Sequence, residues 1–104
     1  MREELLVGYS VEIRRTAYDG KFAQYLWRTT LGGEGFVSVD LGAGVFRPCD
    51  AGGTPVGAMR LNRSVGMVEN ADPEMKENFL VVVSSVLKKW TAEEPPMTAH
   101  RYFG

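Results

Sequence analysis

The stretch from Asp72 to Thr91 constrains the fold of this chain most, because it is the only segment whose sequence pattern predicts a long helix. Asp72-Pro73-Glu74 is typical of a helix start, since Asp accepts hydrogen bonds from first-turn N–H groups and Pro suits the first helical position. Lys88-Lys89 matches the negative end of the helix dipole. Pro95-Pro96 forbids continuation. These signals predict a helix over about residues 73–91.

Apolar residues recur in this stretch at three- and four-residue spacing, which is typical of one buried helical stripe. They are Met75, Phe79, Val82, Val83, Val86, Leu87 and Trp90. The β-branched run Val81-Val82-Val83 favours a strand instead, but length and capping decide for a helix. A single stripe is not stable alone in water, so the helix must lie on an apolar surface.

Apolar and polar residues alternate over residues 5–14, which predicts a half-buried strand. Tyr18-Asp19-Gly20-Lys21 then predicts a hairpin with a three-residue loop. A one-residue slip would turn every side chain to the other face, so matching of apolar residues selects the register. The predicted register places Ile13 opposite Tyr25.

The hairpin leads into a second strand over Lys21–Leu31 and, after the turn Gly32–Gly35, into a third strand. The same matching places Leu31 opposite Val37 and brings Asp40 across from Arg28. Beyond these strands the pattern weakens. Strand-like segments recur at residues 45–47 and 55–62, and residues 65–68 are either a short fifth strand or an irregular lead-in to the helix.

Strands followed by one helix predict an α+β fold. We expect a twisted antiparallel sheet of four or five strands, a meander of hairpins, with one C-terminal helix packed across one face. The 104 residues form a single domain (1–104), with strands over about 5–68, the helix over about 73–91 and a tail over 95–104. A helix about 10 Å wide cannot cover four strands at roughly 4.8 Å spacing. Either the sheet curls around the helix, or a second copy or the tail covers the rest.

Composition excludes several classes of protein. A 44% hydrophobic content fits a folded soluble domain, and a net charge of -1 gives no bulk attraction to nucleic acid or an anionic membrane. The longest apolar run, Phe79–Val83, is far too short to span a bilayer. The charged start Met1–Glu4 predicts no signal peptide. The lone Cys49 suits a reducing compartment, so we predict a cytoplasmic location without a membrane contact.

The predicted outer face of the sheet carries a candidate partner-binding surface centred on Arg28. Its members are Glu12, Arg14, Arg28 and Asp40. A guanidinium can grip a carboxylate or a partner's acidic side chain. Such residues also suit the solvated side of any antiparallel sheet, so the pattern has a purely structural interpretation as well.

The tail adds Tyr102 and Phe103 to the candidate partner-binding residues, because two clustered aromatic side chains are costly to leave in water. They either dock on the chain's own sheet, cross to a partner subunit, or stay disordered. The helix is too narrow to cover the inner face of the predicted sheet. Together with that uncovered area, this tail favours a homodimer or a module that binds another protein.

A second hypothesis is a small-molecule binder or simple enzyme with a cleft between helix and sheet. Tyr9, Tyr25 and Trp27 would form its wall, with a nearby Arg or Asp as the polar contact. A third is a single-stranded nucleic-acid binder that stacks bases on Tyr25 or Trp27. The predicted register places both aromatics under the helix, and the chain is not basic, which argues against nucleic acid.

Catalytic and cofactor signals are weak, and no catalytic residue is assigned. The only residues that could form a nucleophilic triad are Cys49, Asp50 and His100. Of these, His100 lies far along the chain from the other two. One Cys and one His without close spacing do not make a zinc site. Gly42-Ala43-Gly44 lacks the third glycine of a dinucleotide fingerprint. The sequence therefore predicts a non-catalytic binding or self-associating module without a cofactor or metal.

Overall fold

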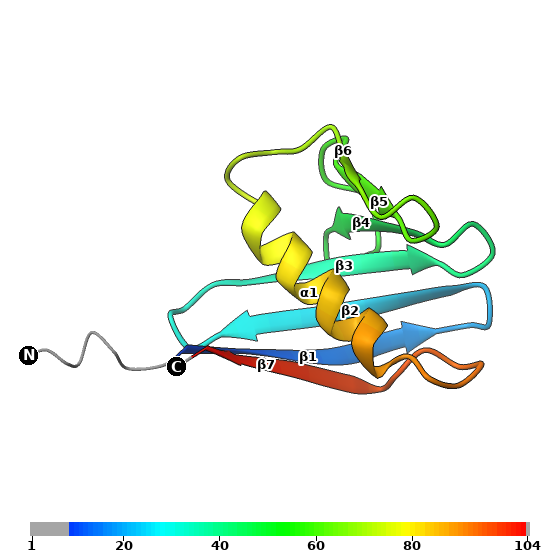
Figure 1. The fold of residues 1–104 in the computed structure, drawn as a ribbon, viewed down its shortest axis with the longest axis horizontal. Helices are drawn as coiled ribbons and strands as arrows, with labels where there is room; N and C mark the ends of the chain where they lie inside the picture. Colours follow the sequence, from blue (N-terminus) through cyan, green and yellow to red (C-terminus); the bar gives the residue numbers. More distant parts are fainter. Residues whose placement is uncertain (1–8, 104) are drawn as a thin grey trace, which may run out of the picture.

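The computed structural model describes residues 9–103, with Phe103 described through its backbone only. Its elements are β1 Tyr9–Tyr18, β2 Phe22–Thr29, β3 Glu34–Asp40, β4 Val45–Cys49, β5 Arg60–Asn62, β6 Val68–Glu69, α1 Lys76–Lys89 and β7 Thr98–Phe103. All strands in this part of the chain join one antiparallel sheet in the order β6-β5-β4-β3-β2-β1-β7 (Figure 1). The α+β class is confirmed, but the prediction of four or five strands is wrong, because the described chain forms seven.

The predicted tail forms the extra edge strand. β7 pairs antiparallel with β1, from Tyr9 opposite Phe103 to Arg14 opposite Thr98. The segment after α1 therefore contains a regular strand, Thr98–Phe103. We considered three alternatives for the tail. The structure shows the first, because the backbone of the tail docks on the chain's own sheet.

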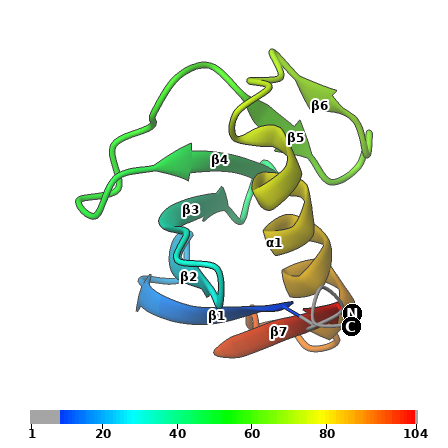
Figure 2. The same ribbon diagram turned by 90° about the vertical axis from the view of Figure 1, so that its left-hand side faces the viewer.

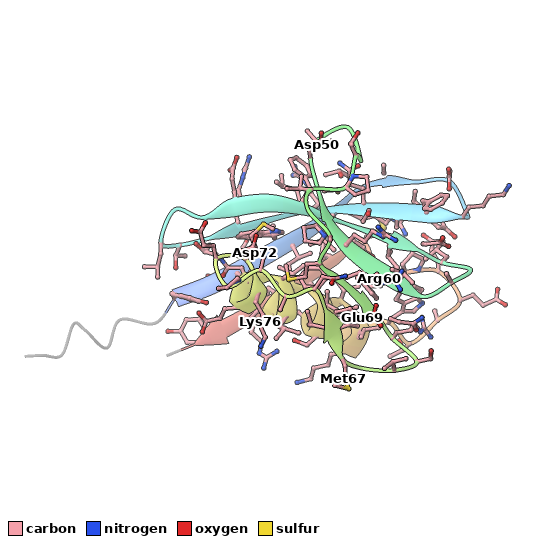
Figure 3. The ribbon with its side chains drawn as sticks, turned by 90° about the horizontal axis from the view of Figure 1, so that it is seen from above. Asp50, Arg60, Met67, Glu69, Asp72 and Lys76 are labelled. Atoms are coloured by element: carbon pink, nitrogen blue, oxygen red, sulfur yellow. The ribbon has the colours of Figure 1, made fainter. Side chains whose placement is uncertain are left out.

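Helix α1 packs its apolar stripe on the inner face of the sheet. Phe79, Val82, Val83 and Val86 are buried. The helix begins at Lys76, later than predicted, because Asp72 caps the turn in front of it: its Oδ1 atom accepts a hydrogen bond from the N–H of Glu74, at 2.9 Å. Figure 3 shows Asp72 on the segment before α1 and Lys76 at the start of the helix.

The sheet curls around α1, with β5 and β6 on one side of the helix and β7 on the other (Figure 2). Inner-face side chains of β1 to β4 are consequently buried. They include Val11, Ile13, Tyr25, Val37, Val39 and Phe46, in the same core as the helix stripe. Curling was one of the ways to close the predicted gap. The homodimer prediction therefore loses the support that an uncovered inner face would have given.

The predicted register between β1 and β2 is wrong by two residues. Ile13 lies opposite Trp27, and Arg15 lies opposite Tyr25. The hairpin closes through a hydrogen bond from the N–H of Asp19 to the carbonyl of Phe22, and a bulge interrupts β1 between Arg15 and Ala17. Because the shift is even, the same side chains still face the core.

The predicted pairing of Arg28 with Asp40 is also wrong. Arg28 lies opposite Glu34, and Asp40 lies opposite Phe22. The turn closes early, because the Thr29 N–H donates to the carbonyl of Gly33 and the Thr29 hydroxyl accepts the Gly33 N–H. The predicted strand ran through Leu31, which is 78% exposed in this turn.

Candidate functional site

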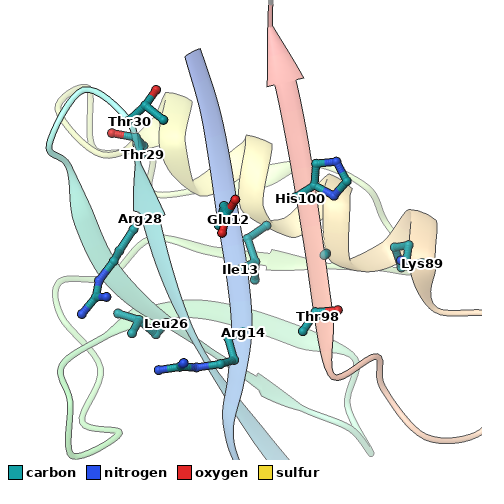
Figure 4. A pocket seen from close by; sticks show the side chains of 11 residues that line it. Glu12, Ile13, Arg14, Leu26, Arg28, Thr29, Thr30, Lys89, Thr98 and His100 are labelled. Carbon is teal, nitrogen blue, oxygen red and sulfur yellow. The ribbon is translucent and has the colours of Figure 1, made fainter. Parts of the chain in front are cut away.

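A hollow of about 550 Å³ lies on the outer face of β2, β1 and β7 (Figure 4). Side chains from all three strands line it. They include Glu12, Arg14, Leu26, Arg28, Thr98 and His100. Lys89, at the end of α1, lines it from beyond the free edge of β7. The hollow therefore extends from the outer face to the sheet edge.

Strand register brings these residues together in rows. Glu12 lies opposite Arg28 on one side and opposite His100 on the other. Arg14 similarly lies between Leu26 and Thr98. Paired residues in a sheet share a face, so the side chains of each row project from the outer face together.

Arg14 and Arg28 form the cationic part of the hollow. In Figure 4 both side chains extend toward the same side, near Leu26, while His100 points the opposite way, toward the edge of β7. Arg28 Nε contacts Glu34 Oε1 at 3.1 Å, and both side chains are more than half exposed. Within residues 9–103, the side chain of Arg14 has no hydrogen-bond or ion-pair partner, while its backbone belongs to the sheet. A guanidinium beside an exposed, exchangeable ion pair is suited to bind an anion.

The structure thus gathers three of the predicted partner-binding residues, namely Glu12, Arg14 and Arg28. Asp40 lies elsewhere, at the end of β3, where its Oδ1 atom accepts the N–H of Ala43 at 3.1 Å. Tyr102 is on the outer face of β7, 69% exposed and opposite Ser10. The side chain of Phe103 lies outside the described residues.

The sequence did not identify His100 and Lys89 as members of this hollow. Both reach it through contacts between segments distant in the sequence: His100 through the pairing of β7 with β1, and Lys89 through the helix packed beside β7. Alternation in the short tail is the one local signal that could have placed His100 on a face with Glu12.

The three predicted ligand-binding aromatics do not line a common cleft. Tyr25 is fully buried, and its hydroxyl donates to the carbonyl of Pro96 at 2.7 Å. Burial raises the pKa of Tyr25 well above its ordinary value. Tyr9 is half-buried and packs against the core. Trp27 lines a cleft of about 200 Å³, beside Met75 just before α1.

Close packing fixes the Trp27 ring in that cleft. Trp27 lies opposite Gly35, and a Cβ at Gly35 would lie 2.8 Å from the ring. A glycine is therefore required where the ring crosses β3. The cleft also exposes Glu74 and Asn78 from the beginning of α1.

The possible triad residues remain apart. Cys49 is on β4 and His100 on β7, with three strands between them, which corresponds to roughly 19 Å at the usual strand spacing. Burial raises the pKa of the Cys49 thiol, which disfavours the reactive thiolate. In the described part of the chain, no group of three His, Cys, Asp or Glu side chains could hold a metal ion.

Comparison with protein-family models, with curated proteins and with solved structures finds no match. Across residues 9–103, no helix is both long and apolar enough to cross a membrane.

Proposed function

We propose that this protein is a non-catalytic binding module that holds an acidic segment of a protein partner in the outer-face hollow. The observation that supports this proposal is the pair of guanidinium groups of Arg14 and Arg28. They lie in one hollow, and Arg14 has no ion-pair partner among the described residues.

The chemistry of the pair fits carboxylates. A guanidinium presents several N–H donors in one plane and binds a carboxylate with two parallel hydrogen bonds. Leu26, on the floor between the two side chains, is only 9% exposed and adds an apolar contact for the carbon chain of a partner's Glu. The Arg28–Glu34 ion pair is exposed and contributes less than about 1 kcal/mol, so a partner's carboxylate can replace Glu34.

The partner we favour is a different protein rather than a second copy. Two copies meeting through this face would bring the same cationic groups together, which opposes association. The homodimer stays an alternative, and sedimentation velocity over a range of protein concentrations distinguishes it. Because Cys49 is a free, buried thiol, we keep the proposal of a cytoplasmic location.

Fluorescence anisotropy with labelled heptaglutamate, at low salt, tests the proposal. The double variant Arg14→Ala/Arg28→Ala should bind at least about tenfold more weakly, since a hydrogen bond to a charged group contributes roughly 1.5–3 kcal/mol. The control Lys76→Ala/Lys88→Ala removes the same charge from exposed helix positions. Equal weakening in both variants would contradict a specific site.

A labelled oligothymidylate serves as the nucleic-acid arm of the same experiment. We expect weaker binding than for heptaglutamate, because Tyr25 is buried and the described residues that line the hollow include no Phe, Tyr or Trp. Tighter, salt-dependent binding of the oligonucleotide would favour the nucleic-acid alternative.

The cleft beside Trp27 supports a second candidate function, which is binding of a small aromatic amine. Its wall combines Trp27 and Met75 with the carboxylate of Glu74. Titration with benzylamine, followed through the indole N–H signal of Trp27 in NMR spectra, tests this candidate. An unchanged signal at millimolar benzylamine would exclude it.

A further inference from the structure

Among the described residues, strand β7 pairs with another strand along one side only, the side that faces β1. It is the last strand in the sheet order, and among the described residues no strand lies beyond it. Its six residues pair with β1 in an uninterrupted register. A regular edge strand of this length offers a row of backbone donors and acceptors to another chain.

The hydrogen-bond pattern identifies the outward-facing backbone groups. The Arg15 N–H donates to the carbonyl of Met97 at 2.8 Å, just before β7 begins. Antiparallel strands alternate between bonded and non-bonded pairs, so Ala99 and Arg101 also direct their backbone groups toward β1. The outward-facing residues are therefore Thr98, His100 and Tyr102.

Three of the usual protections of an edge are lacking at β7. Proteins guard their edges with very short strands, bulges and prolines as well as with charged side chains. The opposite edge, β6, has only two residues, Val68 and Glu69. β7 has neither a proline nor a bulge along its six residues. The two ends of the sheet thus differ, and only β7 is long enough to bind a further strand.

The charge of the edge indicates what kind of strand fits. His100 and Lys89 line the same hollow, whereas Arg101, next to His100 on β7, lies on the inner face and donates to the Ser84 hydroxyl of α1. Pairing β7 with its own copy would bring two identical basic segments together, and like charges on neighbouring strands are destabilising. An acidic side chain on the outer face of the added strand would instead complement Lys89.

We propose that β7 accepts an acidic strand of the partner protein as an eighth strand of the sheet. This inference rests on the proposed function in taking the partner to be acidic. The added strand bonds to the backbone of the three outward-facing residues and places a carboxylate beside the His100 ring, with Cβ atoms about 5 Å apart. The segment that follows the strand can then reach Arg14 and Arg28 across the outer face.

Residue-resolved amide hydrogen exchange tests the inference in the intact protein. The probe is the capped peptide Thr-Val-Glu-Val-Glu-Val-Thr, which favours an extended conformation. At saturation, exchange at Thr98, His100 and Tyr102 should slow at least tenfold. Ala99 should change little, because its N–H already faces β1. Unchanged exchange at the three outward-facing residues with bound peptide overturns the inference.

A matched pair of variants tests the same backbone contact from the protein side. Thr98→Pro removes one outward-facing N–H, and Thr98→Val keeps it while also losing the hydroxyl. We expect about fivefold weaker peptide binding for the proline variant, the loss typical of one hydrogen bond, and less than twofold for valine. Equal binding by both variants contradicts the inference. If Thr98→Pro does not fold, the exchange experiment decides alone.

The outcomes separate this inference from the proposed function. Peptide binding that depends on Arg14 and Arg28 without protection of the edge amides leaves the proposed function standing and removes the eighth strand. Protection of the edge amides without dependence on the two arginines supports the eighth strand and counts against the proposed function. Absence of peptide binding counts against both.

Discussion

The hydroxyl of Tyr25 donates a hydrogen bond to the carbonyl oxygen of Pro96, at 2.7 Å. Opposite Tyr25, Arg15 donates to the carbonyl of Pro95 at 2.8 Å and pairs with Glu94 at 2.9 Å. These contacts hold the segment that joins α1 to β7 against the inner face of the sheet. The position of β7, and with it the edge side of the hollow, therefore depends on buried contacts of β1 and β2.

Tyr25→Phe removes one of these contacts while keeping the ring. We expect a loss of about 1 kcal/mol in the free energy of unfolding, which corresponds to roughly 4–8 °C in the melting temperature. Thermal denaturation followed by circular dichroism measures it. Tyr18→Phe is the control, since Tyr18 is 40% exposed and its ring contact with Arg15 survives the change. Equal melting of the two variants would argue against the role of Tyr25.

Asp19 should make the hairpin between β1 and β2 sensitive to acid. Its carboxylate accepts the backbone N–H groups of Phe22 and Lys21, both at 2.8 Å, and these bonds lower the pKa of Asp19 below its ordinary value of 3.8. A lowered pKa in the folded state means that the stabilisation is present above about pH 3.8 and is lost as the pH falls through the lower folded-state value.

The measurement is the melting temperature of the natural protein and of Asp19→Ala between pH 7 and pH 2. The variant should melt lower at pH 7, and the difference should shrink in acid as the natural protein loses its carboxylate. Asp19→Asn keeps an acceptor that does not titrate, so its difference from Asp19→Ala should persist. If the natural protein melted above Asp19→Ala by the same amount at every pH, a titration of Asp19 would be refuted.

Glu34 competes with a partner for Arg28, so Glu34→Gln should tighten binding of an acidic peptide. The exposed pair contributes little to stability, and we expect a change in unfolding free energy below about 1 kcal/mol. Binding should improve about two- to fivefold, within the range of an exposed ion pair. Anisotropy titration with heptaglutamate provides the measurement.

A second exposed ion pair provides the control for that prediction. Arg60 Nε contacts Glu69 Oε1 at 2.8 Å on the β5–β6 hairpin (Figure 3), and neither residue lines the hollow. Glu69→Gln changes the net charge by the same amount. If it tightened binding as much as Glu34→Gln does, the effect would reflect overall charge and not release of Arg28.

Local signals were sufficient to predict the helix and the faces of the strands. The stripe that contains Phe79 and Val83 has a strong period, and the alternation around Ile13 survives an even register shift. The registers were wrong because hydrophobic matching does not show where a turn closes. The first hairpin closes later than predicted, at Asp19–Phe22, and the second closes earlier, at Gly33. The bulge between Arg15 and Ala17 then leaves the first shift even.

The last strand and half of the hollow could not be predicted in this way. β7 is six residues long and pairs with β1 from the other end of the chain, so no neighbouring turn reveals the partner. Arg14 and Arg28 were predicted as members of a surface, since alternation alone places them on the outer face. His100 joins them only because the tail docks beside β1.

The most direct test of the central claim is the map of ¹H–¹⁵N NMR shifts caused by the unlabelled acidic peptide. If the outer face of β2, β1 and β7 is the binding surface, the largest shifts fall at Arg14, Arg28 and His100. Largest shifts around Trp27 and the start of α1, with the outer face unchanged, would contradict it.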